Sequence, residues 1–198
     1  MAVTDNARLA ARMRIMSLHG ISRDAWKRYT SEGSWYYEIL EAGFKYNLSD
    51  IQAALGLSQL SRMEAFCDAR ERIARRYTAA FSELPELIVP YVDPAGKHAW
   101  HLYMLQIRPE LLTIDRDEFI RALKRRGIGA SVHFIPLHMH PYYRKTYGYR
   151  SDDFPNALQV YRRCISLPIF PAMRPREVDA VIAAVVGIVK SHRKKRWI

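Results

Sequence analysis

The sequence predicts an α/β chain in which a long helix leads into a small α+β domain, where a small sheet is covered by helices. From Ser49 to about Leu84 the pattern is helical. Between Leu57 and Phe81, apolar residues recur at spacings that alternate between three and four, apart from Arg70, which interrupts the row. After Pro85 the pattern changes to strand, strand, helix, strand. Hydrophobic residues make up 49% of the 198 residues, which is ordinary for a globular protein.

The first 48 residues are expected to be mostly irregular around one helix. Thr4 or Asp5 would cap this helix, which runs to about Ser17 and is closed by Gly20. Residues 21–42 are rich in aromatic side chains, which loops seldom carry unless they pack on something. The segment therefore either covers a partner surface or folds back on its own core.

The long helix has a clear start and a clear stop. Ser49 is an N-cap residue with Gln52 three positions later, which is the pattern of a capping box. Pro85 ends the helix. The helix N-terminus could meet an anion, but most capped helices bind nothing, so this feature alone is weak evidence.

Residues 85–198 are expected to hold the sheet and its covering helices. Asp115 and Glu118 form a second capping-box pattern, and Pro175 opens the last helix at its first position. The expected strands are Leu87–Val92, His98–Ile107, Ala130–Ile135 and a short one within 165–171; the expected helices are 116–126, 156–164 and 175 onward. Residues 136–149 are expected to form a loop that carries histidines and tyrosines.

The formal net charge of +11 would suit nucleic acid, an acidic membrane or a phosphorylated small molecule. The charge is spread along the chain, and no RNP, zinc-finger or GXXG motif accompanies it, so nucleic acid is not the expected partner. No apolar run approaches the length of a membrane span, and residues 1–13 lack the apolar region of a signal peptide. Cys67 and Cys164 are not in a CxxC pair, which favours a cytoplasmic protein with reduced thiols.

The histidines of HFIPLHMH, His133, His138 and His140, are the first place to look for chemistry. A metal site needs ligands that converge, usually with a carboxylate or thiolate, and no acidic residue lies among these three. Pocket lining is therefore favoured over metal binding. No GxSxG, Walker A or GxGxxG motif is present, and neither cysteine has a clear activating neighbour.

Several stretches, taken in order, resemble the DegT/DnrJ/StrS family of sugar aminotransferases, pyridoxal-phosphate (PLP) enzymes of fold type I. The matching stretches are AVTDN at 2–6, SLHG at 17–20, GFKYNLSDIQAALGLSQL at 43–60, HAWHLYML at 98–105, GIGASVHFIPLH at 127–138, FPNA at 154–157 and SLPIFP at 166–171. GFKYN followed by SDIQAA is most similar to the branch that acts on UDP-linked 4-ketosugars, as in 4-amino-4-deoxy-L-arabinose synthesis for cell-surface polysaccharides.

The resemblance implies that this chain is the C-terminal half of such an enzyme. The Schiff-base lysine would precede Met1, so no catalytic residue is assigned to this chain. The implied domains are 1–48, the end of the PLP-binding large domain with a dimer loop; 49–84, the connecting helix; and 85–198, the small domain. The full-length enzyme would use PLP, and the isolated chain would bind none and be inactive, because the lysine both holds the cofactor and moves the proton.

Site residues also follow from the resemblance. The loop before the long helix reaches toward the neighbouring subunit's cofactor phosphate, which implies cofactor binding by Lys45 or Asn47. Many members have Asn where this chain has Lys45 and Arg where it has Asn47, so either side chain could serve. The implied substrate-binding residues are His19, Tyr46, His133 and His138.

The resemblance implies transamination of a nucleotide-linked 4-ketosugar by a homodimer, with glutamate as the amino donor. An alternative from another class is a non-catalytic dimerisation or ligand-binding module that keeps this fold. A third is a nucleic-acid binder that uses the basic surface. An in-frame lysine-bearing half upstream would separate the first two, and salt-dependent retention on DNA would test the third.

Overall fold

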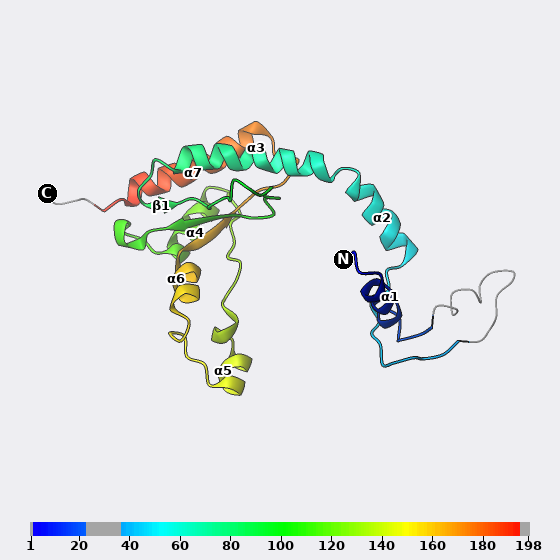
Figure 1. Ribbon diagram of the computed structural model, residues 1–198. Coiled ribbons are helices and arrows are strands. Elements are labelled where there is room, and N and C mark those ends of the chain that lie inside the picture. Colours follow the sequence, from blue (N-terminus) through cyan, green and yellow to red (C-terminus); the bar gives the residue numbers. More distant parts are fainter. Residues whose placement is uncertain (1, 23–36, 195–198) are drawn as a thin grey trace. The chain divides into compact units, whose positions relative to one another are not determined.

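The computed structural model describes residues 2–22 and 37–194, so the aromatic stretch 23–36 lies outside the described residues. The chain divides into two compact units, Met1–Ser61 and Arg62–Ile198, and each is described by itself (Figure 1). The first unit contains α1 (Ala7–Met16) and α2 (Asp50–Leu60). The second contains α3 (Met63–Phe81), β1 (Leu87–Ile88), β2 (Tyr103–Ile107), η2 (Pro109–Leu111), α4 (Arg116–Arg125), η3 (Leu137–Met139), α5 (Pro141–Tyr147), α6 (Pro155–Arg163), β3 (Cys164–Leu167) and α7 (Pro175–His192).

The predicted long helix is two helices. Ser49 caps α2, and both hydrogen bonds of the predicted capping box with Gln52 form. The helix stops at Ser61, whose hydroxyl donates to the Ser58 carbonyl at 2.9 Å, and α3 starts after Arg62 without a side-chain cap. The prediction of one helix over 49–84 was wrong. The helical spacing of apolar residues continues past Ser61 and Arg62, so the sequence pattern gives no sign that the helical backbone is interrupted there.

Three segments of the described chain pair into an antiparallel sheet in the order β1-β2-β3. Leu87 pairs with Ile107 across β1 and β2, and Tyr103 pairs with Leu167 across β2 and β3. The predicted strand at 130–135 is wrong: that segment touches the sheet only through an isolated bridge from Ser131 to Ser166. The expected strands at 87–92 and 98–107 are shorter than predicted, while the one within 165–171 is the third member of the sheet.

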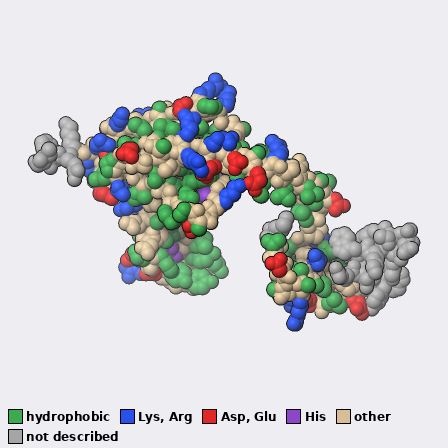
Figure 2. Space-filling model, turned by 45° about the horizontal axis from the view of Figure 1, so that its top comes forward, with side chains coloured by type: hydrophobic (Ala, Val, Ile, Leu, Met, Phe, Trp, Pro, Cys, Tyr) green, Lys and Arg blue, Asp and Glu red, His purple; other side chains and the backbone are tan. Residues whose placement is uncertain are grey.

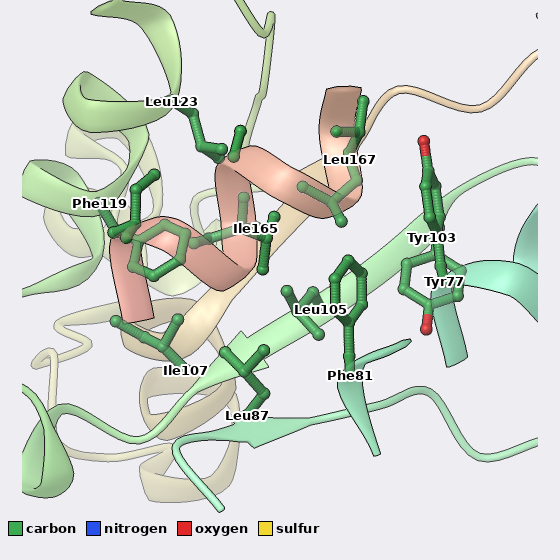
Figure 3. Close-up of a cluster of buried hydrophobic side chains, with 14 of the residues drawn as sticks. Tyr77, Phe81, Leu87, Tyr103, Leu105, Ile107, Phe119, Leu123, Ile165 and Leu167 are labelled. Atoms are coloured by element: carbon green, nitrogen blue, oxygen red, sulfur yellow. The ribbon is translucent and has the colours of Figure 1, made fainter. Parts of the chain in front are cut away.

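The hydrophobic core lies in the second unit, between the sheet and its helices. The Tyr77, Phe81 and Tyr103 rings lie together on one side of this core, with Tyr77 and Tyr103 edge to face at 5.1 Å between ring centroids (Figure 3). α7 packs against both α3 and α4, and its buried residues are Val178, Val181, Ala184, Val185, Ile188 and Val189 (Figure 1). An antiparallel sheet covered by helices confirms the predicted α+β domain.

The first unit has almost no core among its described residues, where Gly20 alone is buried. α2 has no buried residue, and its large apolar side chains are open to solvent (Figure 2). Ile51 is 78% exposed and Leu57 is 69% exposed. α1 is capped by Asn6, which accepts from the N–H groups of Arg8 and Leu9, and not by Thr4 or Asp5 as expected.

Short sequence motifs predicted the starts of two further helices correctly. Asp115 and Glu118 form the predicted capping box of α4, and Pro175 opens α7 at its first turn. The predicted loop over 136–149 was wrong, because it contains η3 and α5. Pro141 sits at the start of α5, where a missing N–H costs nothing, and Gly148 closes it in the left-handed conformation at φ 71°.

Candidate functional site

In the first unit, two glycines let the loop at 43–47 lie directly on the turn that follows α1. A Cβ on Gly43 would come within 2.1 Å of the Gly20 nitrogen, which only glycine avoids. Gly20 itself has φ 69°. This contact between the loop and the turn therefore requires glycine at both positions.

Backbone hydrogen bonds then fix the loop in register with the turn. The Phe44 N–H donates to the Met16 carbonyl at 2.7 Å, and the His19 N–H donates to the Phe44 carbonyl at 2.8 Å. The Tyr46 N–H donates to the Ser17 carbonyl at 2.8 Å. These hydrogen bonds bring together three of the predicted site residues of this unit: His19 on the turn, and Lys45 and Tyr46 on the loop. Asn47 follows directly in the chain.

The side chains of this loop divide by position. The rings of Phe44 and Tyr46 stack at 5.0 Å between centroids with an interplanar angle of 6°. Since side chains alternate along extended backbone, Lys45 and Asn47 alternate with this aromatic pair. Both are exposed, and the carboxylate of nearby Glu41 is already paired with Arg12 at 2.7 Å. The loop thus offers a lysine amine and an amide close together in sequence, next to an aromatic pair.

In the second unit, His133 borders a hollow of about 390 Å³ beside β3. The hollow is lined by residues 101–102, 129–131, 133 and 166–170. His133 is half-buried, and its Nδ1 lies 2.8 Å from the hydroxyl oxygen of Ser166, which is 5% exposed. His133 therefore has a fixed ring in a partly apolar wall.

His138 lies elsewhere in the second unit. It is buried, its ring packs on Phe154 at 4.7 Å between centroids, and its Nε2 lies 3.2 Å from the Ser151 carbonyl. A carbonyl only accepts, so Nε2 carries the proton that it donates. His138 is not among the residues that line the hollow with His133, and the structure does not bring these two histidines into one pocket.

His133 is the one residue of the hollow that the sequence predicted as a site residue, and Ser166 and His101 are among those that it did not. His101 falls within the strand expected at 98–107, but it is exposed and precedes β2, while Trp100 is 4% exposed. Ser166 belongs to a strand whose four residues are all buried, and a lone serine in an apolar run carries no signal of its own. Only the pairing of β3 with residue 131 brings it to His133.

Both cysteines are free and buried. Burial raises the pKa of the Cys164 thiol, and nearby Arg116 opposes that rise only in part. A thiol with a raised pKa is a poor nucleophile at neutral pH. The cytoplasmic location expected from the cysteines stays a prediction.

The described residues of both units, 2–22 and 37–194, contain no group of three or more His, Cys, Asp or Glu side chains arranged to hold a metal ion. Within the same residues, none of the helices combines the length and the apolar character that a bilayer crossing needs.

The fold and the loop motif define a class of protein. The model of the DegT/DnrJ/EryC1/StrS aminotransferase family matches residues 1–186. This chain belongs to that family.

Two curated relatives match nearly the whole chain. The uncharacterized protein MJ1066 of Methanocaldococcus jannaschii is 55% identical over 193 residues, which is 98% of this chain and 50% of the relative. The spore coat polysaccharide biosynthesis protein SpsC of Bacillus subtilis is 52% identical over 191 residues, 96% of this chain and 49% of SpsC. The chain thus spans about half the length of the curated relatives it matches.

Solved structures agree with this assignment. PseC of Helicobacter pylori, an aminotransferase involved in the biosynthesis of pseudoaminic acid, superposes with a TM-score of 0.81 at 25% identity. The match covers 96% of this chain and 48% of PseC. Spr1654 of Streptococcus pneumoniae in its PLP-form gives a TM-score of 0.81 at 28% identity, over 96% of this chain and 46% of Spr1654. The family and its solved neighbours are PLP-dependent sugar aminotransferases.

The described residues fit one end of this cofactor. A phosphate needs cationic or amide donors that no acidic group already occupies, and Lys45 and Asn47 meet that need on an exposed loop. The hydroxyl oxygen of Ser49 accepts a hydrogen bond from the N–H of Gln52 at 3.4 Å, so the start of α2 is already capped. The cofactor's aldehyde needs a lysine amine. The expectation that this lysine precedes Met1 stays a prediction.

Proposed function

We propose that this chain is the C-terminal part of a PLP-dependent aminotransferase that acts on a nucleotide-linked 4-ketosugar with glutamate as amino donor. The observation that carries the proposal is the family match over residues 1–186. The description of SpsC as a spore coat polysaccharide biosynthesis protein supports a sugar as the substrate. The amino group moves from glutamate to the sugar, and the carbonyl oxygen moves from the sugar to the donor. The products are an amino sugar and 2-oxoglutarate.

In this proposal the loop of the first unit serves the cofactor of a second subunit. Lys45 supplies a positive charge and Asn47 an amide donor, and both hold the phosphate. Support comes from their exposure and from their alternation with the stacked pair of Phe44 and Tyr46. Tyr46 on this loop and His19 on the turn that follows α1 then lie on the substrate side.

His133 and His138 belong to the substrate-binding part of the small domain in this proposal. His133 contacts the substrate directly from the hollow beside β3, where its ring is held by Ser166. The ring of His138 is buried and packs on Phe154, which follows α5 in the chain. The chain's net charge of +11 attracts the substrate's diphosphate.

Pyridoxal phosphate, when bound, stabilises negative charge on the carbon from which a proton is removed, and a lysine amine moves that proton. The catalytic lysine lies outside this chain in the proposal, so the chain alone is inactive. Purified chain mixed with PLP and then reduced with borohydride should give no stoichiometric adduct on one particular lysine, as peptide mass spectrometry would report. A single lysine labelled to completion would refute this part.

The transamination itself is tested by supplying the missing half. The chain is fused behind the N-terminal half of SpsC and incubated with glutamate and a UDP-linked 4-ketosugar. The fusion should form amino sugar and 2-oxoglutarate in equal amounts, while this chain alone forms neither. A fusion that folds and binds PLP by absorbance, yet transfers no amino group to any nucleotide-linked ketosugar, would overturn the proposal.

The proposed homodimer is tested on the chain itself. The apolar side chains of α2 are exposed, Ile51 by 78% and Leu55 by 62%, and exposed apolar faces favour association. Light scattering should give twice the chain mass of 23.1 kDa, and Leu55→Lys should shift the dimer toward monomer. Asp68→Lys, on an exposed position of α3, is the matched control. A strict monomer at all concentrations would count against the dimer.

A further inference from the structure

The segment just before β2 makes a tight turn at Trp100. This residue is 4% exposed, yet its φ is 49°, in the left-handed region that bulky side chains rarely adopt. Its ring stacks on the ring of Tyr103 at 5.6 Å between centroids. Packing of a large ring thus keeps the backbone in a conformation that the residue does not prefer, and further contacts have to support that conformation.

His98 supports this turn through a ring nitrogen that carries no proton. The backbone N–H of Trp100 donates to Nδ1 of His98 at 2.9 Å, and the two rings lie 4.3 Å apart between centroids. A backbone N–H only donates, so Nδ1 accepts, and the proton of the neutral imidazole lies on Nε2. His98 is exposed, so its ring can take up a proton from solvent. A proton on Nδ1 turns this acceptor into a donor and breaks the hydrogen bond.

Helix α3 holds the same turn from the other side. Arg70 donates to the Ala99 carbonyl at 2.8 Å, and the indole N–H of Trp100 donates to the carboxylate of Glu71. This carboxylate also accepts from Arg75 at 2.7 Å. The hydrogen bond from Arg75 holds the pKa of Glu71 below its usual range, although burial opposes it. Glu71 therefore stays ionised at a pH where an imidazole takes up its proton.

The groups around His98 decide what a proton on its ring would meet. The titratable side chains that α3 and the segment itself place here are Glu64, Cys67, Asp68, Arg70, Glu71, Arg75 and Lys97. Lys97 is paired with Glu64, and Glu71 is close enough to attract a charge on His98. From β2, Tyr103 stays neutral, because burial raises its pKa to about 12. Protonation thus exchanges the hydrogen bond from Trp100 for attraction to Glu71.

We propose that His98 and Trp100 form a pH-sensitive switch in the turn before β2. The turn is fixed while Nδ1 of His98 is unprotonated, and it is released when this nitrogen takes up a proton, within the range of about pH 8 to 5 in which imidazoles titrate. The next residue, His101, lines the hollow beside β3, so release of the turn changes one wall of that hollow. The consequence for the substrate rests on the proposed function, whereas the switch itself does not.

The test follows the NMR signals of the 198-residue chain from about pH 8 to about 5.5, a range set by imidazole titration. The ring ¹⁵N signals of His98 report its protonation, and the backbone amide signal of Trp100 reports the hydrogen bond. Both should move with the same midpoint, because one proton causes both changes. A Trp100 amide signal that stays in place while His98 titrates would overturn the proposal, and so would a His98 ring that does not titrate in this range.

Two substitutions at His98 should give opposite results. His98→Asn places an amide oxygen two residues before Trp100, where it can accept the same N–H as in an Asx turn and does not titrate. The Trp100 amide signal should then keep its high-pH position throughout. His98→Ala removes the acceptor, so the signal should lie near the low-pH position of the unmodified chain already at high pH. His140→Asn, at a histidine outside this turn, is the matched control and should leave the Trp100 titration unchanged.

The Asn variant keeps the test decisive even if the Ala variant does not fold. A Trp100 signal that still titrates in His98→Asn would assign the pH dependence to another group and overturn the switch.

The link to the hollow is tested in the fusion with the N-terminal half of SpsC. As pH falls over the same range, the KM for the ketosugar should rise about fivefold to tenfold more in the unmodified fusion than in its His98→Asn variant. Equal pH dependence of the two would overturn the link between the turn and the hollow. If no fusion transaminates and the NMR results hold, the proposed function falls and the switch stands. If the fusion is active and the Trp100 signal ignores His98, the switch falls and the function stands.

Discussion

At the residue scale, a buried carboxylate pairs with a half-exposed arginine near the C-terminal end of the described residues. The Glu86 side chain is 3% exposed and receives two hydrogen bonds from Arg193, at 2.5 Å and 3.0 Å. Lys194 donates to the carbonyls of Pro109 and Glu110, each at 3.2 Å. Two residues of the basic block at 192–196 therefore fasten the end of α7 to the segments beside β1 and β2.

Removing the carboxylate charge should cost stability, because Arg193 loses its partner and a buried acceptor is left weakly paired. We expect Glu86→Gln to lower the free energy of unfolding by about 1–3 kcal/mol, measured by urea denaturation at pH 7. Glu64→Gln breaks the exposed pair with Lys97 and is the matched control, with an expected change below about 0.5 kcal/mol. Equal effects of the two variants would contradict this account.

Buried tyrosines should make the protein sensitive to alkali. Burial raises the pKa of Tyr103 to about 12 and also raises the pKa of Tyr77. In the unfolded chain these phenols ionise near their usual pKa of about 10, so the native state holds its protons longer and stability falls as pH rises above that value.

Urea unfolding between pH 8 and about 11.5 should show this loss, and Tyr103→Phe should make the pH dependence shallower. Tyr103→Phe also gives up the hydrogen bond with Thr78 at 3.0 Å, so its stability at pH 8 is lower from the start. Tyr91→Phe, at a side chain that is 83% exposed, should leave the slope unchanged. A Tyr103→Phe slope equal to the wild-type slope would contradict the burial argument.

At the element scale, the two helices that replace the predicted long one differ in what stabilises them. α3 buries Cys67, Ile73, Ala74, Tyr77 and Phe81 against the core. Arg70, which interrupts its apolar row, donates to the Ala99 carbonyl at 2.8 Å and so ties α3 to the segment before β2. None of the residues of α2 is buried, so the stability of this helix depends on its capping box and on any partner surface that covers it.

Helix α4 offers a direct measure of capping, because it packs on the core and its cap is complete. Asp115 accepts from the Glu118 N–H at 2.8 Å, and Glu118 accepts from the Asp115 N–H at 3.2 Å. Asp115→Ala should lower the free energy of unfolding by about 1 kcal/mol, measured by urea denaturation. Asp68→Ala removes an exposed acid within α3 and should change it by less than about 0.5 kcal/mol. A loss no greater than that of the control would mean that the cap is not used.

At the scale of the whole molecule, burial is divided unequally between the units. The buried hydrophobic cluster extends from Ile73 to Val189 and lies entirely in the second unit. The described residues of the first unit bury only Gly20. The second unit can therefore close a core by itself, while the first has large apolar side chains in water.

Amide exchange should follow this division in a demonstrated monomer. We expect slow exchange in 103–107 and 164–167, where the central strands pair, and fast exchange in 2–22 and 37–60. Mass spectrometry of peptides after timed labelling gives the comparison. If association covers α2, exchange should become slower in 50–60 and stay fast in the other segments of the first unit. Equal protection of both units in a monomer would contradict the division.

The sequence by itself determined the elements whose signals are local. The capping boxes at Ser49 and Asp115, the proline at the start of α7 and the apolar row of α3 each need only neighbouring residues, and each forms in the structure. The family stretches also lie within single segments. Family membership and the loop at Lys45–Asn47 could therefore be read without coordinates.

Tertiary structure decided which strands pair and which side chains meet. Residues 164–167 are all buried and so show no alternation, while 130–135 resembles a strand but finds only one bridge. Pairing depends on the register of segments far apart in sequence, which no local pattern encodes. The same long-range pairing brings Ser166 to His133 across 33 positions, so the hollow and the contact between these two side chains came only from the fold.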